Sequence, residues 1–398
     1  MYPGFKVFRQ EVDRLNSPPI KRIDMLFFRP DCRHFTGEKP CAPHKKEGVV
    51  CRDCPRYEPI KKRILIIKLD AAGDVLRSTA ILPAFHQKNP GCSIWWVTEN
   101  GSRPLLEKNP FIDVLLGSDP ALSGYLGATH FHEAYNFDMS RKAAAILYMA
   151  NVPVKKGFGL SKEGVVVPLE SKDEAWFEMG IMDSVKRANR RTYQDHLFRL
   201  GGMKYSGQEP QLVLTEKEKQ WAQAFAEKHK LGRYKKIIGF NIGSGGRWPM
   251  KRWRLDGFVW LARQLRKKYP QNMVLLYGGP EERQLMPELA KKLKNLCIPT
   301  GTENSMRQFV SLVVLADVLV SGDTLAIHIG IALKKRLVAY FGPTSDAEID
   351  LYGRGEKVLP SSPCQCYYQN QCTQKISCMD HLQNKDMLAA VERQLKLC

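Results

Sequence analysis

Short apolar, β-branched runs alternate with amphipathic segments along this chain. The run at 63–69, RILIIKL, is continuous in the way expected of a parallel strand that is buried on both faces. A helical pattern follows at 75–88, and strand patterns follow at 93–99 and 114–117. Strands separated by amphipathic segments form βαβ units, so this part of the chain predicts an open parallel sheet.

The same alternation starts again in the second half of the chain. Strand patterns at 235–243 and 272–280 enclose an amphipathic helix at 255–269, and further strands and helices follow. We therefore predict an α/β protein with two Rossmann-like halves. The expected parts are a cysteine-rich N-terminal extension, two Rossmann-like domains, and a terminal helix that could cross back to the first domain: 1–60, 61–215, 216–380 and 381–398.

The charge of the chain limits its partners. A total of 61 Lys and Arg against 41 Asp and Glu gives a net charge of +20, which favours nucleic acid, an acidic membrane surface or a phosphorylated substrate. The basic residues are spread along the chain without an RNA-binding motif or a helix-turn-helix pattern, so nucleic acid is not expected. No apolar stretch approaches the ~20 residues of a membrane span, and the start, MYPGFKVFRQEVDRL, lacks the apolar core of a signal peptide. We expect a cytoplasmic location.

Ligands of such sheets bind at the loops that follow the strands. NIGSGG at 241–246, which contains Ser244, and SGDT at 321–324 both follow strand patterns. Glycine-rich loops that open a helix bind phosphates through backbone N–H groups, although each loop alone is better explained by a tight strand-to-helix turn. Together they favour a diphosphate site. Lys251, after the first loop, is either a charge for that diphosphate or a solvated lysine at a helix start.

Four further side chains are ambiguous from their local pattern. Asp323 fits an N-cap and His328 a buried core histidine, but both could also face a ligand. Glu282 is either a first-turn acid that suits a helix dipole or a carboxylate that holds a ribose diol. Asp74, in KLDAAGDVLRS, is either a helix-start residue stabilised by the dipole or a group placed for chemistry.

Five successive blocks resemble glycosyltransferase family 9, the ADP-heptose:lipopolysaccharide heptosyltransferases. They are RILIIKLDAAGDVLRSTAILPAF, NIGSGGRWPMKRWRLDGFVWLARQL, VLLYGGPEER, DVLVSGDTLAIHIGIAL and LVAYFGPTSDAE, in the family's order over roughly residues 62–382. The resemblance implies the GT-B fold, in which two Rossmann-like domains face a cleft. It also implies transfer of a heptose from ADP-heptose to a sugar hydroxyl of lipopolysaccharide core, with inversion and without a catalytic metal.

The resemblance assigns roles to individual residues. Asp74 matches the family's general base, and an aspartate, with an ordinary pKa near ~3.9, is ionised at neutral pH and can take the proton of an attacking hydroxyl. The family usually has glycine two residues after the aspartate of the fourth block, where this chain has Leu325, so the donor sugar or its pose can differ. Acceptor recognition is expected within 103–160, with Arg141 and Lys142 as candidates. The expected donor-binding residues are Gly73, Ser244, Lys251, Glu282, Asp323, Thr324 and His328.

Eight of the eleven cysteines lie in two clusters. In a chain without a secretion signal, such clusters indicate a structural zinc or iron site, or else reduced structural thiols. His34 and His44 are alternative ligands in the first cluster. The candidate metal ligands are Cys32, Cys41, Cys51 and Cys54, and in the second cluster Cys364, Cys366, Cys372 and Cys378.

The sequence thus predicts an inverting glycosyltransferase that takes a nucleotide-sugar donor and a glycolipid or surface-glycan acceptor. Its basic surface could bring it to the anionic inner face of a membrane, near such acceptors. One alternative is a non-catalytic, metal-stapled protein that binds nucleic acid or anionic glycan. The others are another GT-B transferase or a nucleotide-sugar epimerase.

Overall fold

The computed structural model describes residues 27–246, 248–369 and 371–398. The chain divides into two compact units, 1–60 and 61–398. Within the first unit, whose residues 1–26 lie outside the described part, Cys32 and Pro59 form an isolated β-bridge. The short helices of this unit are α2 (Ala42–Glu47) and η2 (Cys51–Asp53).

The second unit contains two six-stranded sheets, which we call the sheets of the first half and the second half. In the first half the strand order is β3-β2-β1-β4-β5-β6, and every described pairing is parallel except that of β5 with β6. The strands are β1 (Lys62–Ile67), β2 (Cys92–Val97), β3 (Val114–Leu116), β4 (Glu133–Asn136), β5 (Lys155–Leu160) and β6 (Val166–Pro168). The helices are α3 (Ala72–Ser78), η3 (Thr79–Ile81), α4 (Leu82–Lys88), α5 (Arg103–Leu106), α6 (Leu122–Ala128), α7 (Arg141–Met149), η4 (Ser171–Asp173), α8 (Glu174–Ile181), α9 (Asp183–Ala188) and α10 (Tyr193–Leu200).

The sheet of the second half is parallel throughout its described pairings and has the order β12-β11-β10-β7-β8-β9. Its strands are β7 (Ile237–Asn241), β8 (Met273–Tyr277), β9 (Cys297–Pro299), β10 (Val318–Gly322), β11 (Arg336–Tyr340) and β12 (Gly355–Val358). Its helices are α11 (Glu216–Lys228), η5 (Leu231–Arg233), η6 (Pro249–Lys251), α12 (Leu255–Lys268), η7 (Pro280–Glu282), α13 (Leu285–Leu293), η8 (Lys294–Leu296), α14 (Met306–Val313), α15 (Leu325–Ala332), η9 (Cys378–His381) and α16 (Asn384–Lys396).

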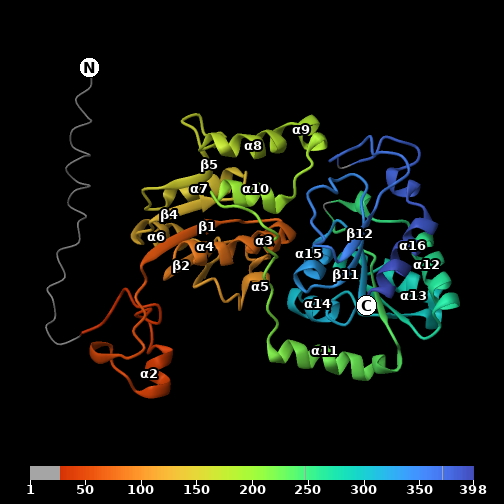
Figure 1. Cartoon of the computed structure of the whole chain (residues 1–398), viewed down its shortest axis with the longest axis horizontal. Helices are drawn as coiled ribbons and strands as arrows, with labels where there is room; N and C mark the ends of the chain where they lie inside the picture. Colours follow the sequence, from red (N-terminus) through yellow and green to blue (C-terminus); the bar gives the residue numbers. More distant parts are fainter. Residues whose placement is uncertain (1–26, 247, 370) are drawn as a thin grey trace. The chain divides into compact units, whose positions relative to one another are not determined.

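Both sheets have the doubly wound order, in which successive strands are added first on one side of the first strand and then on its other side. The change of side lies between β1 and β4 in one sheet and between β7 and β10 in the other, and ligands bind at such points. Figure 1 shows the two sheets as separate layers flanked by helices. The predicted α/β fold with two Rossmann-like halves is therefore confirmed.

The continuous apolar run of the first strand is explained by cover on both faces. Ile64 and Ile66 pack in a cluster with Phe85 of α4, whereas Leu65 and Ile67 pack in a second cluster with helices α6 and α7. All four side chains are fully buried. A strand in this position gains from apolar side chains at every residue, which removes the alternation seen in half-exposed strands.

Two sequence predictions differ from the structure. The helix predicted at 75–88 is divided into α3, η3 and α4, with a proline at the start of α4, where its missing N–H costs nothing. The closing helix, expected to cross back to the first domain, packs in the second half instead. Its buried residues, including Leu388 and Val391, join the cluster of Phe258 and β7.

Candidate active site

A cavity of about 730 Å³ opens between the two halves, at the carboxyl ends of β1, β4, β7, β8 and β10. It is lined by all of the predicted catalytic and donor-binding residues: Gly73, Asp74, Ser244, Lys251, Glu282, Asp323, Thr324 and His328. These residues lie in loops and helix starts that follow the strands and are up to 255 positions apart in the sequence (73 to 328). They meet because parallel strands end at the same edge of a sheet.

Asp74 lies in the first turn of α3, in which Ala71 is the N-cap, so its carboxylate is not used for capping. The side chain is 34% exposed and forms an ion pair with Arg77, whose Nη2 lies 2.7 Å from Oδ1. Desolvation acts to raise the pKa of Asp74, but the positive charges of Arg77 and Lys68 outweigh it and lower the pKa below its ordinary value. Asp74 is therefore an ionised carboxylate at the cavity wall.

Gly73 lies directly against His328 of the other half. A Cβ atom at Gly73 would approach the His328 Cδ2 atom to 2.4 Å, so the two helices meet this closely only because the residue is glycine. Figure 1 shows α3 and α15 side by side at this contact. His328 is 6% exposed, and desolvation and the charge of Arg77 lower its pKa to about 4. Its imidazole is therefore neutral at pH 7.

Lys251 is not a solvated surface lysine. It ends η6, its side chain is 15% exposed, and its Nζ donates to Asp323 Oδ2 at 2.8 Å and to the Asp323 carbonyl at 3.2 Å. Burial disfavours the Asp323 carboxylate, but the charges of Lys251 and His328 lower its pKa to about 2. The ammonium group is thus held at the cavity by an ionised partner.

Thr324, and not Asp323, is the N-cap of α15. Its hydroxyl accepts from the Ala326 N–H at 3.2 Å and is also contacted by Asn241 Nδ2 at 3.1 Å. This leaves the Asp323 carboxylate free to pair with Lys251. Asn241, at the end of β7, is 5% exposed and lines the cavity. It was not predicted from the sequence as a site residue, although a polar side chain at the end of a buried strand could have indicated it.

Glu282 is 4% exposed and lies beside the loop after β7. Its Oε2 accepts from the Gly279 N–H at 2.9 Å, and a Cβ at Gly243 would approach the carboxylate to 2.6 Å. The helix-start and ligand interpretations of Glu282 are therefore compatible, because one carboxylate oxygen accepts from a backbone N–H of the turn while the residue also lines the cavity. Met306 and Phe309 complete this part of the wall.

The two acceptor candidates do not line this cavity. Lys142 Nζ donates to Glu99 Oε1 at 2.5 Å and to Ser118 at 3.2 Å, and Arg141 precedes it at the start of α7. Lys142 is held toward the loops after β2 and β3 instead. The wall on the first-half side, which sequence reasoning missed, is formed by Lys68, Arg77, Phe137, Met139, Trp176, Met179, Lys186 and Tyr193.

The two predicted cysteine clusters contain no group that could hold a metal ion in the described part of the chain. Among residues 27–246, 248–369 and 371–398 no three His, Cys, Asp or Glu side chains make a group that could hold a metal ion. In the first cluster Cys41 precedes α2, Cys51 begins η2 and Cys32 lies in the β-bridge, so the thiols belong to separate local elements. The four thiols of the second cluster lie near one another: Cys364 is hydrogen-bonded to Cys378 and Cys366 to Cys372, and Cys372 also interacts electrostatically with Cys364 and Cys378. All eight are free thiols.

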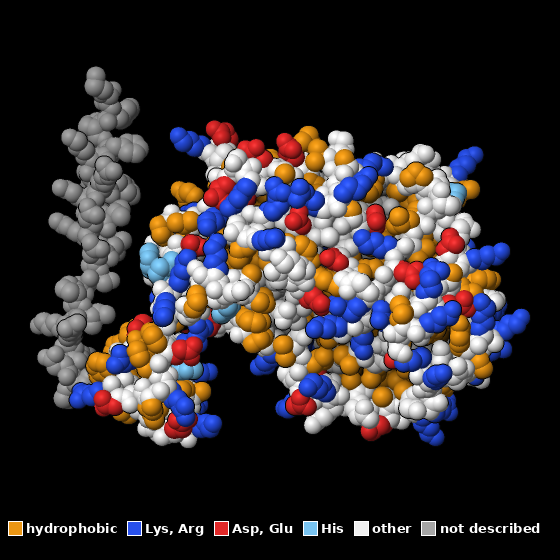
Figure 2. Space-filling model, viewed as in Figure 1, with side chains coloured by type: hydrophobic (Ala, Val, Ile, Leu, Met, Phe, Trp, Pro, Cys, Tyr) orange, Lys and Arg blue, Asp and Glu red, His pale blue; other side chains and the backbone are white. Residues whose placement is uncertain are grey.

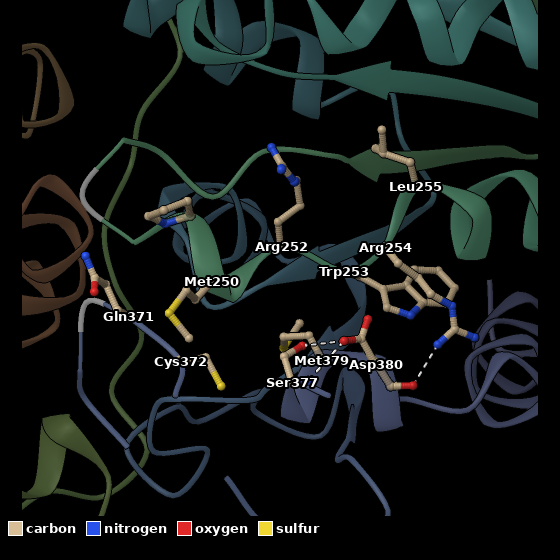
Figure 3. Close-up of a pocket in the computed structure, with 11 residues that line it drawn as sticks. Met250, Arg252, Trp253, Arg254, Leu255, Gln371, Cys372, Ser377, Met379 and Asp380 are labelled. Carbon is tan, nitrogen blue, oxygen red and sulfur yellow. Dashed lines mark hydrogen bonds between the residues drawn. The ribbon is translucent and has the colours of Figure 1, made fainter. Parts of the chain in front are cut away.

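A second cavity of about 570 Å³ lies on the second half beside η6 and η9 (Figure 3). Its polar groups mostly satisfy one another. Ser377 Oγ donates to Asp380 Oδ2 at 2.9 Å, and Arg254 Nη1 donates to the Asp380 carbonyl at 2.8 Å. Cys372 also lines it, and the described part of the chain holds no group of three His, Cys, Asp or Glu that could bind a metal ion.

Figure 2 shows Lys and Arg side chains dispersed over the visible face and interspersed with acidic ones. Many are paired, as for Lys268 with Glu392 and Arg393 with Glu356. Within the described residues no helix combines the length and apolar character needed to cross a membrane.

Two Rossmann-like halves that line one cavity with the loops after their strands have the architecture of the GT-B fold. Residues 121–380 match the family described as glycosyltransferase family 9 (heptosyltransferase). The chain belongs to glycosyltransferase family 9. Asp74 precedes the matched segment, so its placement rests on the geometry described above.

Individual relatives agree with this assignment. The chain is 25% identical over 303 residues to lipopolysaccharide heptosyltransferase 2 of Escherichia coli (strain K12), covering 71% of this chain and 83% of that protein. The crystal structure of a family 9 glycosyl transferase from Veillonella parvula DSM 2008 superposes with a TM-score of 0.69 at 18% identity, covering 85% and 98% of the two chains. The structure of E. coli ADP-heptose lps heptosyltransferase II superposes with a TM-score of 0.58 at 20% identity, covering 83% of this chain and 99% of that chain. At these identities the two structures show the shared fold.

Proposed function

We propose that this glycosyltransferase moves a heptose from ADP-heptose, or a related sugar from a similar nucleotide, to a hydroxyl of a lipopolysaccharide-core or other surface-glycan acceptor. One observation carries the proposal: the Asp74 helix of the first half lies in direct contact with the turn of Asp323 and His328 in the second half. An acceptor hydroxyl beside Asp74 would therefore face a sugar whose diphosphate is held by that turn.

In the proposed reaction the acceptor oxygen attacks the anomeric carbon as the bond to the diphosphate oxygen breaks. Asp74 takes the hydroxyl proton, which its ionised state allows. The leaving diphosphate gains negative charge near Lys251 and the N-terminus of α15, both already in place before reaction. Because base and leaving-group site lie on opposite sides of the cavity, the proposed transfer inverts the anomeric centre. No step needs a metal ion.

The nucleotide would lie along the second half, which we assign to residues 216–380, with the acceptor domain at 61–215. Glu282 would accept hydrogen bonds from ribose hydroxyls, and the loop of Ser244 would approach the diphosphate. Met306 and Phe309 offer an apolar surface for the base. This division leaves the first-half wall for the acceptor.

The acceptor would contact the wall of Phe137, Trp176, Met179 and Lys186. Aromatic faces suit the apolar faces of sugar rings, and Lys186, whose Nζ lies 3.7 Å from the Tyr368 ring centroid, adds a positive charge. The net charge of +20 would favour peripheral contact with an anionic inner membrane surface, where a lipid-linked acceptor is available. We place the protein in the cytoplasm on this basis.

The donor sugar is the part of the proposal with a second candidate. Leu325 lines the cavity at the start of α15, immediately after Thr324, where the family resemblance leads one to expect glycine. Its side chain occupies space beside the diphosphate turn. A sugar smaller than heptose, carried by ADP or another nucleotide, therefore fits the observation as well.

A paired measurement tests the proposal. Asp74→Asn keeps the size of the side chain and removes the base, so turnover with a nucleotide-sugar panel that includes ADP-heptose should fall by about 10² or more. The Kd for ADP, measured by calorimetry, should stay within about threefold because the nucleotide contacts lie in the other half. Asp256→Asn, at a carboxylate that is 78% exposed, is the matched control. Normal turnover by Asp74→Asn would remove the base assignment, and no turnover of any nucleotide sugar by the wild type would remove the function.

A further inference from the structure

Arg77 is a buried cation at the junction of the two halves that the proposed chemistry does not use. Its side chain is 10% exposed and lines the cavity. Nη2 lies 2.7 Å from Asp74 Oδ1 and 3.8 Å from Glu348 Oε2, and Nη1 donates to the Glu348 carbonyl at 3.5 Å. Asp74 belongs to the first half and Glu348 to the second, so one guanidinium contacts both.

The surroundings hold Arg77 in one place. Its guanidinium carbon lies 3.7 Å from the centroid of the Tyr193 ring. Tyr193 is itself fixed, since its backbone N–H donates to the Glu348 carbonyl at 3.0 Å and its hydroxyl bonds Ser78 Oγ at 2.8 Å. A planar cation stacked on a fixed ring can aim a carboxylate that it binds, because little rotamer freedom is left.

Glu348 makes the contact depend on the second half. It is 7% exposed, and burial raises its pKa, against the opposing effect of Arg77. A buried carboxylate of this kind needs the guanidinium as a partner. Arg77 thus has Asp74 of the first half on one side and Glu348 of the second half on the other.

We infer that Arg77 is a positioning residue, which orients the Asp74 carboxylate and links that orientation to the presence of the second half through Glu348. This rests on the proposed function of Asp74 as the base. Arg77 need not touch substrate in this role. It acts through Asp74, and its removal would leave the base in place with its orientation no longer fixed and its pKa higher.

Removal of Arg77 should leave a distinctive pH signature, because an adjacent opposite charge lowers an aspartate pKa by about 1 to 3 units. Without Arg77 the acid limb of kcat/KM moves to higher pH by about that amount, since Asp74 then protonates more readily. Lys68 and His328 still face the carboxylate and limit the shift. The charged and titratable groups around Asp74 and Arg77 are Lys68, Tyr193, Asp323, His328 and Glu348.

The test compares Arg77→Met, Arg77→Lys and the exposed control Lys219→Met with the wild type and Asp74→Asn. Arg77→Met should lower kcat about ten- to hundredfold and raise the acid limb, with the Kd for ADP within about threefold. Arg77→Lys, which keeps the charge but not the planar fork, should restore the acid limb and only part of kcat. If Arg77→Met does not fold, Arg77→Gln replaces it with the same expected shift.

A cycle with Glu348→Gln measures the link between the halves. We expect the effects of Arg77→Met and Glu348→Gln on kcat to be clearly non-additive, as for residues that share an interaction. If Asp74→Asn is inactive but Arg77→Met has a normal kcat and an unchanged acid limb of kcat/KM, the positioning role is overturned and the proposed function remains intact. An active Asp74→Asn would overturn both, so the two failures are distinguishable.

Discussion

Gly73→Ala should disturb the contact on which the active site depends. The added Cβ would lie 2.4 Å from His328 Cδ2 and 3.0 Å from Nε2, whereas relaxed carbon contacts are about 3.5–4.0 Å. The imidazole is 6% exposed, so about 1 Å must come from a shift of the ring or from separation of α3 and α15. Such overpacking costs about 1–3 kcal/mol.

A matched glycine isolates this cost. Alanine in a helix is favoured over glycine by about 1 kcal/mol, which offsets part of the clash in Gly73→Ala. Gly124 in α6 has no atom within 4 Å of its would-be Cβ, so Gly124→Ala should show the helix gain alone. The difference in the free energy of unfolding between the two variants, from urea titration at unchanged m, should therefore be about 1–3 kcal/mol.

Activity provides the second readout. A displacement of about 1 Å at the base can lower turnover about a hundredfold, so Gly73→Ala should lose much of its activity while Gly124→Ala keeps the wild-type rate. If both variants show the same shift of the urea midpoint and Gly73→Ala turns over normally, the close approach of α3 and α15 does not exist in solution.

Two further predictions follow from the charges of the site. Lys251→Ala should weaken ADP binding about tenfold or more by calorimetry, because a charged hydrogen bond to the diphosphate is lost; unchanged affinity would contradict its role. The pKa of His328 and that of His196 are both lowered to about 4, chiefly by desolvation, from an ordinary 6.5. As the pH falls, each histidine is protonated in the unfolded state at a higher pH than in the folded state. The free energy of unfolding is therefore at its full value above about pH 6.5 and declines toward pH 4, by on the order of 3 kcal/mol for each residue. Urea titrations at pH 7.5 and pH 5 measure this loss, and equal stability at both pH values would show that the imidazoles are not buried as neutral groups.

Local patterns were informative where one physical requirement dominated. The β-branched run of β1 predicts a strand because both of its faces are covered, and the glycine-rich loops after β7 and β10 predict the cavity edge because parallel strands end together. The family blocks assigned the donor-binding residues, and all of these line the cavity. Arg141 and Lys142, the candidates for acceptor recognition, do not line the cavity, and the local sequence does not reveal that Lys142 pairs with Glu99.

The cysteines illustrate a related limit. Their spacing satisfies a ligand pattern, but a metal site needs side chains that converge, and convergence depends on how short irregular segments fold. The position of the terminal helix could not be predicted either, because its apolar face is able to cover either half. In the structure that face packs in the cluster around Phe258.

The sequence by itself determined the two alternating α/β halves, the phosphate-type loops and the identity of Asp74 as a candidate base, because these depend on residues that are close together in the chain. The tertiary structure alone decided what Asp74 faces. Arg77 and Glu348 are 271 positions apart, and Gly73 meets His328 only when the two halves pack together. Contacts of this kind depend on the packing of separately encoded elements, and that packing places the turn of Asp323 and His328 next to the helix of Asp74.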